Sequence, residues 1–386
     1  MTLPLDTAQP SNSRRYDLDW LRVIAFGLLI FYHVGMFYVT WNWHVKSVHM
    51  SSAAQPLMVV INPWRLALLF FISGIAIRFA SDKQKITTFT ASRSFRLFIP
   101  IVVGMFFVVA PQSYFQLRQA DIIEPGFGAF YSGYLAEDES YGISTPTWNH
   151  LWYVVYLFVY GLLLAPFFPL LRRIANSRAL TWFFASNLRV IFLTAIPFVL
   201  YTYLLNPLFP TTHNLTEDWA NHAHSLTILL LGYMVAKNDG FWRVIGRVWP
   251  VTAAAVVILL AYRLWVIDAW KVWMQHSALA PIVGPSWETV ETYYAWLSIL
   301  TLLGLAQRFL NRPSAVLRYL TGAVFCYYIL HQTITVSAGY WLTRQGLGVW
   351  TEFLLVTGAT ALGCALGYEI LRRIPWVRIG FGIKQR

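Results

Sequence analysis

The feature that most constrains this chain is a series of long apolar segments spread along its whole length. An α-helix crosses the hydrocarbon core of a bilayer with about 20 apolar residues, and ten segments approach or reach that length. The segments lie near residues 20–40, 57–80, 97–117, 150–170, 188–206, 222–236, 249–267, 292–310, 319–341 and 349–371. Their apolar runs are continuous and do not alternate as barrel strands do. We therefore predict an all-α, polytopic membrane protein with about ten transmembrane helices.

The composition supports this prediction, because 57% of the residues are hydrophobic and only 12% are charged. A soluble domain carries roughly 25% charged residues, so a soluble, disordered or coiled-coil chain is excluded. Cys326 and Cys364 both lie in apolar runs, which indicates no disulfide framework. We expect a cytoplasmic N-terminal tail at 1–19, a single transmembrane domain at 20–371 and a basic cytoplasmic tail at 372–386.

The distribution of basic residues predicts the orientation. One set of loops carries 22 Lys and Arg residues and the opposite set carries only 4, out of 29 in all. Because basic residues collect in cytoplasmic loops, both termini should be cytoplasmic. The formal net charge of +12 is then a topological signal rather than a sign of nucleic-acid binding. The expected location is a cell membrane, with the bacterial inner membrane favoured.

The first apolar segment holds ionisable residues, which are costly at membrane depth and indicate function. Asp19, Arg22 and His33 all lie on it. Arg22 and His33 are separated by about 16 Å along a helix and face within roughly 20° of the same direction. Asp19 is placed to pair with Arg22. The alternative is that Arg22 is a topological anchor and His33 a hydrogen-bonded core residue.

A second histidine in an apolar segment weakens that alternative. His331 lies thirteen residues beyond Arg318, or about 20 Å from the cytoplasmic face, which is a depth comparable to that of His33. Two imidazoles at one depth suit proton transfer. The spacing of His213, His222 and His224 does not predict a metal site, because His222 and His224 point to different helix faces.

Five short motifs follow one another along this chain. The first, DWLRVIAFGLLIFYH, contains Asp19, Arg22 and His33. It is followed in order by FFISG at 70–74, RSFRLFIP at 93–100, HLWY at 150–153 and YYILH at 327–331. Together they resemble the motifs of the acyltransferase 3 family of membrane acyltransferases, with Asp19, Arg22 and His33 at the positions of its opening motif. Within the family, WNWHVKS at 41–47 and NHLWY at 149–153 are similar to the periplasmic glucan succinyltransferase branch.

The resemblance implies transfer of an acyl group, of acetyl or succinyl type, from cytoplasmic acyl-CoA to a hydroxyl of an extracytoplasmic glycan or lipid-linked sugar. Acyl-CoA would be a donor substrate, with no permanently bound cofactor, no metal and no nucleic-acid partner. The residue roles implied are His33 and Asp19 in catalysis, Arg22, Arg93 and Arg96 in binding the donor, and His331, Tyr328, Trp152 and His150 in binding substrate. His33 would act as general base, or would carry the acyl group itself.

Two other functions are compatible with the residues alone. A secondary transporter could use His33 and His331 as a proton relay, and would need no acyl-CoA. A membrane partner for glycan export would bind the acceptor without cleaving any thioester.

Overall fold

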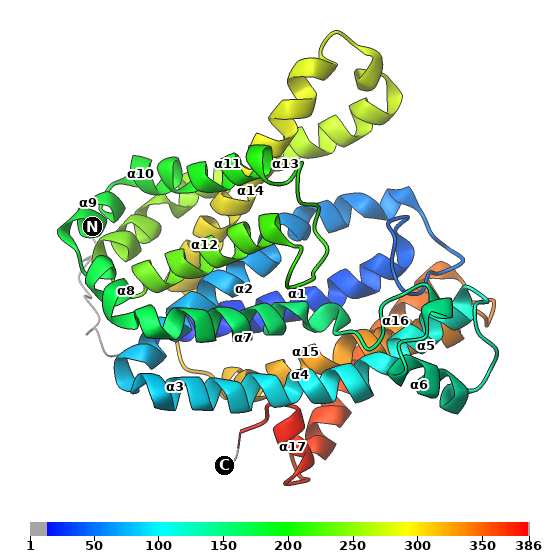
Figure 1. Ribbon diagram of the computed structural model, residues 1–386. Helices are drawn as coiled ribbons and strands as arrows, with labels where there is room; N and C mark the ends of the chain where they lie inside the picture. Colours follow the sequence, from blue (N-terminus) through cyan, green and yellow to red (C-terminus); the bar gives the residue numbers. More distant parts are fainter. Residues whose placement is uncertain (1–13, 385–386) are drawn as a thin grey trace.

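The computed structural model describes residues 14–384, and in this range every regular element is helical (Figure 1). The first half contains α1 (Tyr16–Tyr38), α2 (Gln55–Lys83), α3 (Ile86–Arg93), α4 (Ile99–Val103), α5 (Ala110–Gln119), α6 (Phe127–Leu135), α7 (Trp152–Leu164), α8 (Phe168–Ala175) and α9 (Arg178–Phe184). The second half contains α10 (Asn187–Ile191), α11 (Ile196–Leu204), α12 (Trp219–Val235), α13 (Asp239–Val272), α14 (Ala280–Phe309), α15 (Ala315–Leu342), α16 (Val349–Leu371) and α17 (Val377–Gly380).

Short single-turn helices complete the chain. They are η1 (Ser52–Ala54), η2 (Ser94–Phe98), η3 (Gly104–Val109), η4 (Glu139–Tyr141), η5 (Asn149–Leu151), η6 (Ala165–Phe167), η7 (Leu193–Ala195) and η8 (Met274–His276). The predicted tails at 1–19 and 372–386 lie partly outside the described residues. Within them, α1 already begins at Tyr16.

The all-α membrane class is confirmed, since within residues 14–384 seven helical segments are long and apolar enough to span a bilayer. These segments are Tyr16–Tyr38, Ser52–Lys83, Ile86–Gln119, Asn149–Ala175, Asn187–Leu204, Asp239–Trp270 and Val349–Leu371. The other three predicted spans coincide with α12, α14 and α15, which are helices of 17, 30 and 28 residues. The count of about ten spans stays a prediction.

The third span is longer and less regular than its apolar run predicts. It begins at Ile86 instead of residue 97, and two π-helical turns, η2 and η3, interrupt it. Each turn lies just before a proline, Pro100 or Pro111. A proline ring clashes with the carbonyl four residues earlier, so widening the turn removes the clash. As a result Arg93 and Arg96 lie on a helix and not in a loop.

Helix α1 lies in the middle of the bundle, where it packs against α2, α14, α15 and α16. Its buried face includes Leu18, Leu21, Ala25 and Leu29, which recur at helical spacing. This position explains why the ionisable residues of α1 face the protein interior. Arg22 and His33 are thereby presented to the neighbouring helices at two different depths.

Two glycines bring α2 and α12 into backbone contact. A Cβ atom at Gly74 would lie 1.8 Å from the Leu229 carbonyl oxygen, and one at Gly232 would lie 2.0 Å from the Phe71 carbonyl oxygen. Only glycine allows such a close crossing. Helix packing therefore explains why the FFISG segment has a glycine at position 74.

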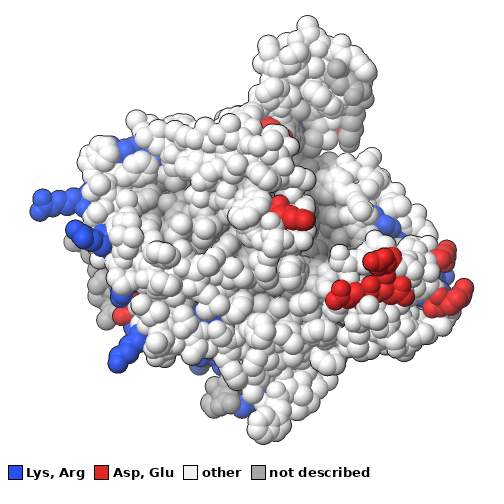
Figure 2. All heavy atoms as spheres, viewed as in Figure 1, with Lys and Arg blue, Asp and Glu red and all other residues white. Residues whose placement is uncertain are grey.

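Charged side chains separate toward opposite ends of the molecule. On the face shown in Figure 2, most Lys and Arg residues lie toward one end, while Asp and Glu gather near α5 and α6 at the other. This agrees with the predicted orientation. The long connection after α5 contains α6 and a small aromatic core of Phe130, Tyr134 and Tyr141.

Candidate active site

Two histidines from opposite ends of the sequence form the centre of the site. His33 on α1 and His331 on α15 are 298 residues apart, yet His33 Nδ1 lies 2.7 Å from His331 Nε2. No part of His331 is exposed, whereas His33 is only partly buried. The prediction that the two imidazoles lie at one depth is confirmed by this hydrogen bond. His331 lies behind His33, and the role in binding substrate expected for it stays a prediction.

The backbone fixes how protons are arranged in this pair. His331 Nδ1 lies 2.7 Å from the Tyr328 carbonyl oxygen, which can only accept, so Nδ1 carries a hydrogen. In neutral His331 the other nitrogen, Nε2, is then an acceptor for the N–H at His33 Nδ1. A neutral His33 consequently has its lone pair on Nε2. That atom makes no hydrogen bond with the described residues, so it is available to take a proton.

His150 and Tyr328 join the start of the fourth span to α15. His150 Nε2 lies 3.1 Å from the carbonyl oxygens of both Tyr328 and Ile329, and the Tyr328 hydroxyl donates to the His150 carbonyl oxygen. Gln112 on α5 adds contacts to His150, Gln332 and Thr333. Because their polar atoms bond to protein, His150 and Tyr328 position the site more than they offer groups to a ligand.

His33 faces a cavity of about 470 Å³, the His33 chamber. It is within the range of small-molecule sites. Trp43 stacks along the His33 ring with 6.2 Å between centroids, and Trp152 stacks on His213 at 4.3 Å. Since Trp43 and His213 belong to loops on the acidic end, the chamber lies toward that end of the molecule. Trp152, His150, Tyr153 and Tyr328 also line it.

Arg22 lies at the other end of α1, where Asp19 holds it. Arg22 Nη2 is 3.2 Å from Asp19 Oδ1, and Arg14 bonds the other oxygen of Asp19 at 2.7 Å. Asp19 is fourteen residues before His33, or about 21 Å along the helix. It therefore does not contact His33 but holds Arg22, and the catalytic role expected for it stays a prediction.

The predicted donor-binding arginines lie on the same basic end of the protein. Arg93 lies over the Phe89 ring, and Arg96 is exposed one turn later. The C-terminal Lys384 joins them: its partial desolvation and the nearby charges of Arg96, Arg22 and Arg14 lower the pKa of its amine. These residues form a basic cluster drawn from three parts of the chain: Arg14 and Arg22 near its start, Arg93 and Arg96 on the third span, and Lys384 near its end. Clustered positive charge of this kind attracts anions.

Arg65 is the most important residue that sequence reasoning passed over. Its side chain on α2 is only 7% exposed, with Nη1 2.5 Å from Asn62 Oδ1 and the guanidinium 3.4 Å above the Tyr32 ring. It lines the His33 chamber. An arginine inside an apolar segment is itself a signal of function. Its depth alone, however, could not show which cavity it faces.

The fold and site thus define a multi-pass membrane protein with a histidine pair beside a chamber toward its acidic end and a basic cluster at the opposite end. A family model described as an acyltransferase domain matches residues 15–369, so the chain belongs to the acyltransferase 3 family and is a membrane acyltransferase. It is similar to the glucans biosynthesis protein C of Escherichia coli O1:K1 and of strain K12, with 23% identity over 96% of this chain and 95% of theirs. No solved structure matches the chain.

Proposed function

We propose that this acyltransferase moves an acyl group from cytoplasmic acyl-CoA to a hydroxyl of an extracytoplasmic glycan or lipid-linked sugar in the bacterial inner membrane. The observation that carries the proposal is the His33–His331 hydrogen bond beside an outer chamber. The similar Escherichia coli proteins are named for glucan biosynthesis, which supports a sugar acceptor.

In the proposed reaction, His33 Nε2 takes the proton of the acceptor hydroxyl. The hydroxyl oxygen forms a bond to the thioester carbonyl carbon, the bond from carbon to sulfur breaks, and the thiolate of CoA leaves. The proton held by His33 is then given to that thiolate. While His33 is charged, His331 Nε2 accepts from its Nδ1–H and stabilises the imidazolium. An acyl-histidine would divide the same overall transfer into two steps.

The donor would bind with its phosphates at the basic cluster and its thioester directed toward His33. Arg22, Arg93 and Arg96 offer guanidiniums that suit phosphate. Between them and the chamber lies Tyr153, which is in electrostatic range of Arg22 and Arg93 and bonds Ser73 Oγ at 2.7 Å. Ser73 is thus held by a tyrosine rather than by a base, which argues against its being a nucleophile.

The first prediction tests His33 directly. His33→Ala should lower transfer by about 10²- to 10⁴-fold, the usual contribution of a general base. Purified protein is incubated with a panel of acyl-CoA species and glycans, and mass spectrometry follows free CoA and acylated sugar.

His276→Ala is the matched control, because His276 is exposed and lies outside the chamber. Full activity in folded His33→Ala protein would contradict the mechanism. Proton-coupled flux without acyl-CoA would favour the transporter alternative.

A further inference from the structure

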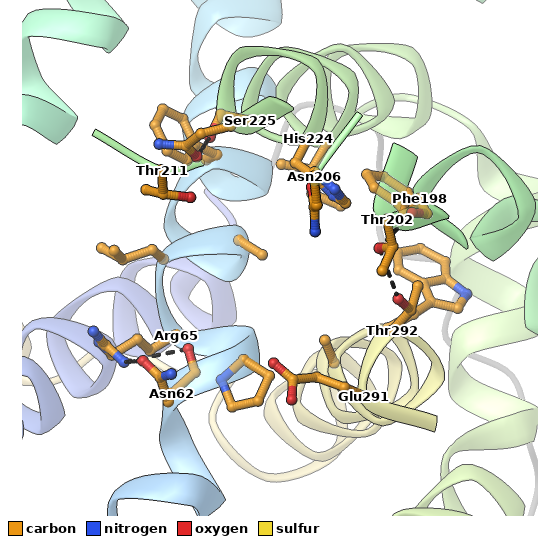
Figure 3. Close-up of a pocket in the computed structure, with 18 of the residues that line it drawn as sticks. Asn62, Arg65, Phe198, Thr202, Asn206, Thr211, His224, Ser225, Glu291 and Thr292 are labelled. Carbon is orange, nitrogen blue, oxygen red and sulfur yellow. Dashed lines mark hydrogen bonds between the residues drawn. The ribbon is translucent and has the colours of Figure 1, made fainter. Parts of the chain in front are cut away.

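A second cavity, of about 510 Å³, adjoins the His33 chamber (Figure 3). It lies among α2, α11, α12 and α14, and we call it the side cavity. Arg65, Leu66, Trp152 and His213 line both cavities, so the two share a wall. The mechanism described above uses no residue that belongs to the side cavity alone.

The lining of the side cavity suits a polyhydroxylated ligand. Hydroxyl and amide groups come from Thr202, Asn206, Asn221 and Ser225, and Figure 3 shows such groups arranged around an open centre. Aromatic rings of Trp152 and Phe198 lie among them, as in sites that bind the apolar faces of sugar rings. Thr202, Asn221 and Ser225 each bond to a neighbouring protein group. The side chains of Asn206 and Thr211 make no hydrogen bond with the described residues, so they can offer theirs to a ligand, and an acyl chain would leave them unpaired at a cost.

The charges around the side cavity are balanced. Arg65 lies on one side and Glu288 on the other, while Glu291 is paired at 3.0 Å with Arg263 of α13. Arg263 is only 2% exposed and also donates to the Val59 carbonyl oxygen, so the pair is held in place. This arrangement favours an uncharged ligand over a phosphate or a uronic acid.

Arg65 connects the side cavity to the catalytic histidine. Asn62 Oδ1 accepts hydrogen bonds from both Arg65 and the Tyr32 hydroxyl, and Tyr32 directly precedes His33. The Nε of Arg65 is buried and has no partner among the described residues. A fixed donor at the shared wall is well placed for a ligand that extends from one cavity into the other.

The loop at the shared wall is also held rigidly. The buried carboxylate of Asp218 accepts from the backbone N–H groups of Thr212 and His213 at 3.0 and 3.1 Å, and from the Tyr156 hydroxyl at 2.6 Å. The position of His213 against Trp152 is thereby set before any ligand binds. Such pre-organisation lowers the entropy cost of binding.

We propose that the side cavity binds the neutral sugar units adjacent to the one whose hydroxyl is acylated at His33. The inference rests on the proposed function, and it adds that the acceptor is an uncharged oligosaccharide recognised over more than one unit.

The test measures binding without acyl-CoA, so that it can fail independently of the transfer reaction. Full-length protein in detergent is titrated by calorimetry with glucose and with unsubstituted gluco-oligosaccharides of increasing length. We expect affinity to rise with the first added units. Equal affinity for glucose and the longer oligomers would overturn the proposal. Loss of transfer with intact binding would overturn only the proposed chemistry.

Two tryptophan substitutions, one at the side cavity and one outside both cavities, provide matched variants. Asn206 is exposed and points into the side cavity, so Asn206→Trp should fold and weaken oligosaccharide binding about tenfold or more through lost hydrogen bonds. Gln345→Trp, on an exposed residue outside both cavities, should bind normally. Unchanged binding in Asn206→Trp, or equal binding of an oligomer of glucuronic acid, would contradict the assignment.

Discussion

At the scale of single residues, the site depends on which ring nitrogen carries a proton. The Tyr328 carbonyl oxygen orients His331, and His331 in turn orients His33. In the proposed mechanism, the base is therefore oriented through the backbone of α15 and not by a carboxylate. Asp19 has a different task at the other end of α1, where it holds Arg22.

His331 should act on the chemical step through His33. In His331→Phe the acceptor for His33 Nδ1–H is lost, and a hydrogen bond to a charged group contributes about 1.5–3 kcal/mol. We expect kcat to fall about 10- to 100-fold with KM little changed. His331→Asn, which keeps an acceptor, should recover part of the rate. A change confined to KM, or no recovery with Asn, would show that His331 is only structural.

Lys46 in the first outer loop should make stability depend on pH. Its Nζ donates to the carbonyl oxygens of Met36 and Val39 at 2.6 and 2.5 Å, and burial lowers its pKa to about 8. The unfolded chain, with a pKa near 10.5, binds more protons between these values. The contribution of Lys46 to folding stability is therefore smallest below pH 8 and rises as the pH increases through this window.

The measurement is the thermal midpoint of wild-type and Lys46→Met protein in detergent. The midpoint of the wild type relative to the variant should increase from about pH 8 to about pH 10. Lys83→Met, at an exposed lysine, controls for the change in net charge. A difference that stays constant or decreases over this range would show that burial does not lower the pKa of Lys46.

At the scale of elements, the site depends on how closely helices approach. Sequence patterns predicted the spans that contain α1, α7 and α15 and the candidate site residues on them. They did not reveal that η2 and η3 widen the third span, because a π-turn depends on where a proline ring meets a carbonyl within the helix. They also left the role of Gly74 open, since the contact it makes is with the distant Leu229.

Gly74→Ala should destabilise the crossing of α2 and α12. The added Cβ meets backbone atoms that cannot rotate away, so the helices must separate and the side cavity between them must change shape. We expect a lower yield of monodisperse protein and a lower thermal midpoint. Gly27→Ala is the control, because a Cβ at Gly27 has nothing within 4 Å. Equal stability of both variants would show that the crossing tolerates separation.

At the scale of the whole molecule, the two ends have different chemistry. The basic cluster of Arg22, Arg96 and Lys384 is at one end, and the His33 chamber with its outer loops is toward the other. A donor that enters from one side and an acceptor that enters from the other would meet along α1. The side cavity extends the acceptor side toward α11, α12 and α14.

The orientation can be tested with single cysteines in intact cells. Both native cysteines are buried and free, so they give a low background. A membrane-impermeant maleimide should label Glu139→Cys, on the acidic end, and should not label Arg178→Cys, on the basic end. Permeabilised cells should label both. Labelling of Arg178→Cys in intact cells would reverse the predicted topology.

The sequence by itself determined the class of fold, the positions of most spans, the family motifs and the predicted orientation. Partition into a bilayer and charge at its surface are properties of each segment, so they can be read locally. Only the tertiary structure decided that His331 lies behind His33, that Asp19 serves Arg22, and that Arg65 joins two cavities. These contacts depend on which helices touch and how closely, and residues 298 positions apart carry no local sign of that.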